Sequence, residues 1–142
     1  MKDTTIYKPK KGPFAGICIT PIYHRRLQIY PTKEDALMDI SDCPMLEEGN
    51  FGALSTVVAC DDVGEFLVLA FNGPQYMTPE VVSHEAVHLA WFALDLAGVE
   101  VTVDNHEQLA YLVGYYVNQI NLVVEAYLNH VKKLKEDSDE KV

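Results

Sequence analysis

Apolar and polar positions in the first fifty residues change in short blocks. Residues 15–22 and Arg26–Tyr30 are rich in Ile, Leu and Tyr, a composition typical of strands, and Pro21 and Pro31 mark where these segments end. Residues 33–40 follow Thr32, whose hydroxyl suits a helix N-cap, and they begin with an acidic pair, so a short helix is predicted. Residues 43–50 show no period and are expected to form a loop.

Two apolar, β-branched segments come next, Ala53–Cys60 and 65–71. The residues between them end in Gly64, which can adopt the positive φ that hairpin turns require. We expect these segments to pair in a small, mainly antiparallel sheet, with 65–71 as its edge strand.

The pattern then changes to helical spacing. Thr78 is a suitable N-cap and Pro79 a suitable first residue, which predicts a helix over 79–97 that ends with Gly98 in the left-handed conformation. After a connector at 99–103, a long helix should begin near Asp104 or Asn105 and continue to Lys135. Its apolar positions step by three and four residues: Leu109, Val113, Tyr116, Ile120, Val123, Tyr127, Val131 and Leu134.

Strands before two major helices indicate an α+β class. A chain of 142 residues suits one domain, expected over 1–135, with a mobile basic N-terminus at 1–13 and a charged disordered tail at 136–142. Polar residues interrupt every long apolar stretch, so neither a membrane span nor a secretory signal is visible. The three cysteines lack CxxC spacing, which favours reduced thiols and a cytoplasmic location.

Charge is distributed unevenly. The net charge is −10, and residues 34–131 contain sixteen Asp and Glu but no Lys or Arg. Such an acidic body repels phosphate backbones, so we expect no nucleic-acid binding by it. The same acidity favours basic polypeptides as partners.

The chemistry is concentrated in His84-Glu85-Ala86-Val87-His88, an HExxH motif on the first predicted major helix. Histidines four residues apart differ by about 40° around a helix, so both rings can reach one metal ion. Glu85 lies to one side, where it can act as a base rather than a ligand. The composition predicts only about 0.01 chance matches to this motif in a shuffled chain.

Glu107 follows His88 after eighteen intervening residues, and over 84–111 the sequence resembles the gluzincins, zinc peptidases of the thermolysin and aminopeptidase type. It is also similar to small zincin-like peptidases of bacteriophages. The resemblance implies a zincin-like fold, one Zn²⁺ per chain bound by His84, His88 and Glu107, and Glu85 as general base. His106 stands where that family usually has Asn, and Tyr111 stands where thermolysin relatives have an Asp that orients a ligand histidine.

Other roles for these residues remain open. With Asp104 as N-cap, Glu107 would complete a capping box that needs no metal. His106 or Asp104 are alternative third ligands. Asp95 could orient a ligand histidine, and the phenol of Tyr111, or less readily that of Tyr115, could stabilise an oxyanion.

The leading hypothesis is therefore a zinc metallopeptidase that acts on polypeptides. One alternative is a catalytically silent zincin-like binding protein, for example a phage or host-interaction factor. The other is an acidic interaction module without metal that associates through the apolar seam of the C-terminal helix at 109–134.

Overall fold

The computed structural model describes residues 4–62 and 64–140. Its five strands form one sheet in the order β1-β2-β3-β5-β4, with the bounds β1 Thr5–Tyr7, β2 Ala15–Ile19, β3 Arg26–Tyr30, β4 Ala53–Cys60 and β5 Gly64–Phe71. β3 and β5 pair in parallel, whereas the other neighbouring strands pair antiparallel. The sheet is mixed and mainly antiparallel, and the predicted α+β class is confirmed.

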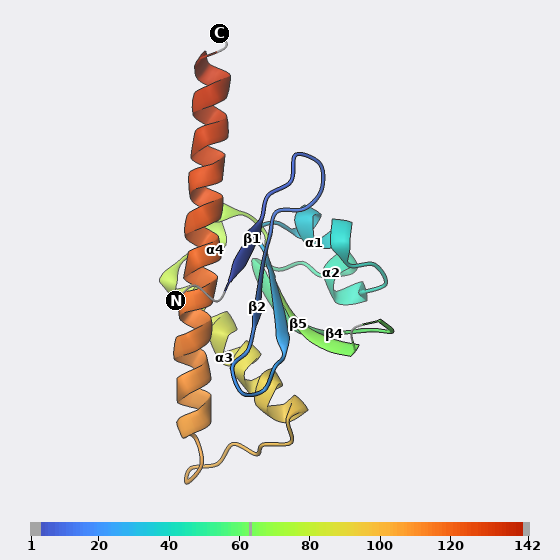
Figure 1. Cartoon of the computed structure of the whole chain (residues 1–142), viewed down its shortest axis with the longest axis vertical. Coiled ribbons are helices and arrows are strands. Elements are labelled where there is room, and N and C mark those ends of the chain that lie inside the picture. The colour runs from blue at the N-terminus through green and yellow to red at the C-terminus, as the bar shows by residue number, and fades with distance from the viewer. Residues whose placement is uncertain (1–3, 63, 141–142) are drawn as a thin grey trace.

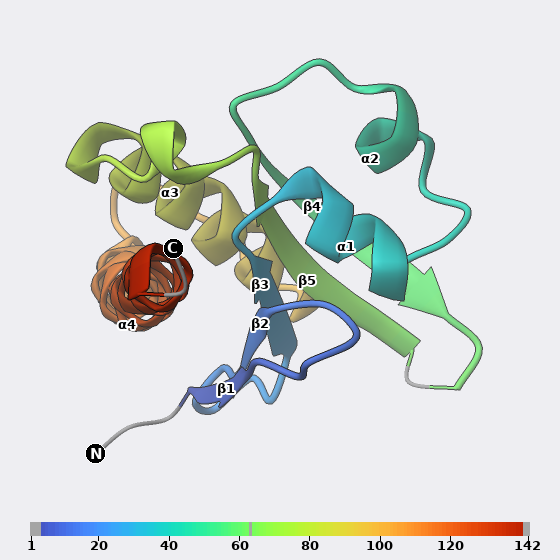
Figure 2. The same cartoon turned by 90° about the horizontal axis from the view of Figure 1, so that it is seen from above.

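Helices cover both faces of this sheet (Figure 2). The short helices α1 and α2 lie on one face, and the longer α3 and α4 lie side by side on the other (Figure 1). A 3₁₀ turn, η1, precedes α3. The bounds are α1 Lys33–Asp39, α2 Pro44–Glu48, η1 Pro74–Tyr76, α3 Pro79–Leu96 and α4 Glu107–Glu140. Within the described residues, no helix combines the length and apolar character that crossing a bilayer requires.

The two layers of helices create two cores. Leu27, Ile29 and Leu69 face the larger core under α3 and α4, while Tyr30 and Val68 face the smaller one under α1 and α2. Because both faces of β5 are covered, its residues from Phe66 to Phe71 are all buried. The prediction that 65–71 is an edge strand is therefore wrong: β5 is interior, and the edge strands of the described sheet are β1 and β4.

The local start and stop signals act as predicted. Thr32 and Thr78 cap α1 and α3, each accepting a hydrogen bond from a backbone N–H three residues later, at 3.0 and 3.2 Å. Gly64 in the β4–β5 turn and Gly98 after α3 have φ values of 74° and 73°. Gly64 is thus the first residue of β5 and Gly98 follows the end of α3, both in the left-handed conformation that the sequence indicates.

Two short elements depart from the predictions. Part of the predicted mobile segment 1–13 forms β1, which pairs with β2, and Thr4 beside it hydrogen-bonds the buried Gln119 of α4. The predicted loop 43–50 contains the single-turn helix α2, in which Leu46 is buried in the smaller core. Both elements are too short for their apolar residues to show a helical or strand periodicity, and tertiary contacts stabilise them.

The bounds of α4 also differ from the prediction. Thr102 and Asn105 pair through their backbones in a turn, so the helix cannot begin at Asp104 or Asn105. The carbonyl of His106 instead accepts the N–H of Ala110, which makes Glu107 the first helical residue and leaves the predicted capping box unformed. At the other end, α4 continues to Glu140, so the predicted disordered tail is helical over 136–140, and 141–142 lie outside the described residues.

Candidate metal centre

Helix α3 brings the two histidines of the HExxH motif together. The Nε2 atoms of His84 and His88 are 3.2 Å apart, and both side chains are exposed. With Zn–N bonds of 2.0–2.1 Å, two imidazoles on one tetrahedral zinc have nitrogens about 3.3 Å apart. The spacing therefore fits two ligands of one ion.

Glu85 completes a cluster with these rings. One ligand atom from each of the three residues lies within 4.8 Å of the others. Unlike the histidines, Glu85 is buried, with 5% of its surface exposed, and its Oε2 has no hydrogen-bond partner. An unpaired buried carboxylate oxygen costs free energy, so a group beside it that supplies a proton or a positive charge fits this position.

Burial also affects the protonation of this carboxyl group. Desolvation raises the pKa of Glu85 above its ordinary value, and the neighbouring His88 and His84 partly offset that increase. The edge strand β4 also contacts this residue: its Ser55 hydroxyl donates to the Glu85 backbone carbonyl at 3.4 Å. Glu85 is thus enclosed between α3 and β4.

A pocket of about 360 Å³ opens beside this cluster. Its wall combines the start of β4 with one side of α3: Gly52, Ala53, Glu80, Val81, His84 and Glu85. β4 pairs only with β5 in the described sheet, so its outer edge is not used within the sheet. His84 therefore lies beside the start of a strand whose outer edge is unpaired in the described sheet.

The structure does not bring Glu107 to the cluster. Glu107 is exposed at the first residue of α4, level with the carboxyl end of α3 (Figure 1). From His88 to that end α3 rises by about 12 Å. The alternative third ligands, Asp104 and His106, are exposed in the same connector and also lie outside the cluster.

The other predicted site residues are also apart from the histidines. Tyr111 is 56% exposed on the outer side of α4, where it lines a separate hollow with Gly114. Tyr115 donates its hydroxyl to the Ile19 carbonyl at 3.2 Å. Asp95 is exposed on α3, about two turns beyond His88, too far to orient that ring.

Two residues of this region were not identified from the sequence. Ser55 supports Glu85 from β4, and Glu80 lines the pocket one helical turn before His84. A polar residue in an otherwise apolar strand was the available signal for Ser55. Glu80 resembles an ordinary acidic residue of a first helical turn, so its place in the pocket depends on how β4 packs.

Searches against protein-family models, curated proteins and solved structures found no match to this chain. The assignment of the site therefore depends on its residues and their geometry.

Proposed function

We propose that this chain is a zinc-dependent peptidase in which His84 and His88 bind the ion and Glu85 is the general base. One observation carries the proposal: two converging imidazoles stand beside a buried carboxylate that has an unpartnered oxygen. A purely structural site has no need of such a carboxylate, because its ligands are already satisfied.

The chemistry divides between the ion and the protein. Bound zinc supplies Lewis acidity and lowers the pKa of water toward about 7. The Glu85 carboxylate accepts the proton of the attacking water and returns it to the leaving amine. Glu85 lines the pocket, and the Ser55 hydroxyl of β4 donates to the Glu85 backbone carbonyl behind it.

The polypeptide binds along β4 in this proposal. Its backbone would hydrogen-bond the free edge, which places a carbonyl carbon over the pocket beside His84. This replaces the sequence-based expectation that 65–71 forms the cleft edge. Glu107 is retained as the proposed third ligand on the gluzincin-like spacing, and its ligation requires residues 97–106 to carry the start of α4 toward His88.

Glu85→Gln tests the proposal, with Glu100→Gln as a charge-matched control in the exposed connector. Zinc content and digestion of a peptide library are measured for each protein. We expect Glu85→Gln to retain about one zinc per chain and to lose about 100-fold or more of the hydrolysis rate. Glu100→Gln should match the wild type.

The remaining outcomes separate the alternatives. A wild type that binds zinc but cleaves nothing would be a zincin-like binding protein rather than an enzyme. A wild type that binds no zinc would exclude both of these and leave the acidic interaction module. Undiminished hydrolysis in Glu85→Gln would remove Glu85 as the base.

A further inference from the structure

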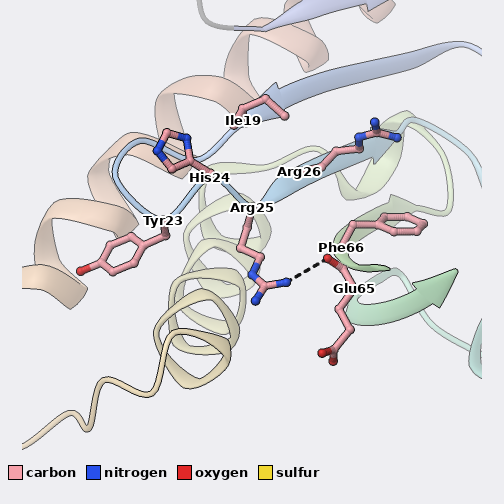
Figure 3. A pocket seen from close by; sticks show the side chains of 7 residues that line it. All are labelled: Ile19, Tyr23, His24, Arg25, Arg26, Glu65 and Phe66. Carbon is pink, nitrogen blue, oxygen red and sulfur yellow. Dashed lines mark hydrogen bonds between the residues drawn. The ribbon is translucent and has the colours of Figure 1, made fainter. Parts of the chain in front are cut away.

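A second pocket, of about 270 Å³, is drawn in Figure 3. It lies at the start of β5, whereas the pocket beside His84 includes Ala53, which pairs with Phe71 at the end of β5. It is lined by residues of the segment 19–26, which joins β2 to β3, together with Glu65 and Phe66 at the start of β5. It shares no lining residue with the pocket beside His84. The two pockets are therefore formed by different side chains.

This pocket is lined by basic side chains, whereas residues 34–131 contain no Lys or Arg. The sequence contains only two arginines, and Arg25 and Arg26 both line the pocket, with His24 beside them. Figure 3 shows these three side chains spread around it, with Ile19 and Phe66 between them. Arginine presents a planar array of donors that matches carboxylates and phosphates better than lysine does.

Most of those donors are unused. Arg25 donates to the Glu65 backbone carbonyl at 3.2 Å, and Arg26 donates to the Gln28 side chain at 3.5 Å. In the part of the chain that the structure describes, these are the only hydrogen bonds of the two guanidinium groups, each of which has five N–H donors. The Glu65 carboxylate points away from His24 and Arg26 (Figure 3).

The turn that presents these residues is tightly bonded. The Thr20 N–H donates to the Arg25 carbonyl at 2.8 Å, the Thr20 hydroxyl donates to the same carbonyl at 2.9 Å, and the His24 N–H donates to the Thr20 carbonyl at 2.8 Å. Ile22 and His24 have left-handed φ values of 68° and 54°, unfavourable for residues with a Cβ. The hydrogen bonds hold this conformation, so the basic side chains extend from a preorganised base.

We propose that this pocket binds a small apolar carboxylate. Arg26 binds the carboxylate head, and its neighbours across the sheet, Ile19 on β2 and Phe66 on β5, contact the apolar body. Arg25 lies on the other side of the pocket, where it donates to the Glu65 carbonyl (Figure 3). The volume is below that of pockets for drug-sized ligands, which limits the body to about one ring or a short alkyl chain. The negative charge of Glu65 at the rim favours a singly charged head over a doubly charged phosphate.

Titration of the ¹⁵N-labelled protein followed by NMR tests this site. The probe is 3-phenylpropanoate, and 3-phenylpropanamide and phenyl phosphate are its neutral and doubly charged counterparts. We expect saturable shifts at residues 19–26 and 65–66 with the carboxylate, weaker ones with phenyl phosphate and none with the amide. Equal shifts with the amide would overturn the proposal, and tighter binding of phenyl phosphate would overturn the choice of carboxylate.

Variants then assign the contacts. Arg26→Gln should weaken the binding of 3-phenylpropanoate about 10-fold or more, because it removes the charged donors of the head. Arg25→Gln removes a charge on the other side of the pocket and should weaken binding less. Lys132→Gln on the exposed part of α4 changes the net charge equally and should have no effect. Unchanged binding in Arg26→Gln, or an equal loss in Lys132→Gln, contradicts the proposal.

Two further arms complete the design. The melting temperature of Arg26→Gln is compared with that of the wild type, and we expect no change, because among the described residues the only hydrogen bond of this guanidinium is the one to Gln28. Acetyl-alanyl-phenylalanine and its amide distinguish the two sources of a carboxylate. Tighter binding of the peptide acid than of 3-phenylpropanoate would identify a peptide C-terminus as the ligand, and weaker binding would identify a free acid.

Discussion

Thr20 and Tyr116 join the β2–β3 turn to the long helix. The hydroxyl oxygens of Thr20 and Tyr116 are 2.7 Å apart. Because the Thr20 hydroxyl already donates its proton to the Arg25 carbonyl, the Tyr116 hydroxyl must be the donor to Thr20. Both residues are fully buried. Desolvation raises the pKa of Tyr116 above the ordinary tyrosine value. The folded protein therefore keeps this proton at a pH where the unfolded chain loses it.

This difference predicts a stability loss in alkali that depends on Tyr116. Tyr116→Phe should cost about 1 kcal/mol near neutral pH, because it removes one hydrogen bond. Above about pH 10 this phenol ionises in the unfolded wild type but stays protonated in the folded protein, whereas Tyr116→Phe has no such group. The difference in the free energy of unfolding between wild type and variant should therefore shrink by up to about 1.4 kcal/mol per pH unit. Urea unfolding from pH 8 to 11 measures the gap. A gap that stays constant to pH 11 would show that the phenol is not desolvated.

Glu107 allows a sharper test of the third ligand. Glu107→Gln preserves the side-chain shape at the exposed start of α4, so its effect on folding stability should be small. If this residue ligates zinc, the variant should lose about 10-fold or more in zinc affinity. Trp91, the only tryptophan, is three residues beyond His88 and provides a fluorescence readout of the titration. Unchanged zinc affinity would show that Glu107 is no ligand.

The site illustrates which residues a sequence can locate. His84, Glu85 and His88 lie within two helical turns, so the helix alone determines their mutual positions. The contribution of Ser55 depends on the packing of β4 against α3, and the place of Glu107 depends on the path of residues 97–106. Neither arrangement follows from local spacing, because both are set by tertiary contacts.

The elements that could be predicted from the sequence are those whose ends are marked by capping or turn residues. The capped helices α1 and α3 and the β4–β5 hairpin agree with their patterns. β1 and α2 were missed because three and five residues are too short for a periodic signal. The edge strand was misassigned because strand order is decided by pairing across the sheet, for which composition is a weak guide.

The contact between β2 and α4 predicts a sensitive position at Gly16. A Cβ at this residue would overlap the Val123 side chain of α4. Gly16→Ala should therefore destabilise the protein by about 1–3 kcal/mol through overpacking. Urea unfolding of Gly16→Ala, Val123→Ala and the double variant measures the coupling. The double variant should be more stable than the two single losses predict, and strict additivity would contradict this account of the contact.

Across the whole molecule, α4 combines two environments. Its first two thirds bury Leu112, Tyr116, Ile120 and Val123 against the larger core, so most of the predicted interaction seam serves the fold itself. Beyond that, α4 extends past the sheet, and residues 132–140 are exposed (Figure 1). This distal part contains three Lys among its charged residues, whereas 34–131 contain no Lys or Arg.

The acidic body predicts the preferred substrate of the proposed peptidase. Residues 34–131 lack Lys and Arg, and Glu80 adds a carboxylate to the pocket itself. Peptides with flanking Lys should therefore be cleaved faster than matched Glu peptides, with the difference shrinking at high salt. Glu80→Gln should reduce this preference more than Glu100→Gln does. Equal rates for both peptides at low salt would exclude electrostatic selection.

The parallel pairing of β3 with β5 has a consequence for the order of folding. The chain between Tyr30 and Gly64 contains α1, α2 and β4, so this pairing must close a long loop, whereas the β4–β5 hairpin and the adjoining α3 are local. Substitutions at the Ile29–Leu69 pair should therefore slow refolding, whereas those in the last turns of α4 should mainly speed unfolding. Because the walls of the metal pocket belong to this local part of the chain, we expect them to form before the long-range closure joins them to the rest of the sheet.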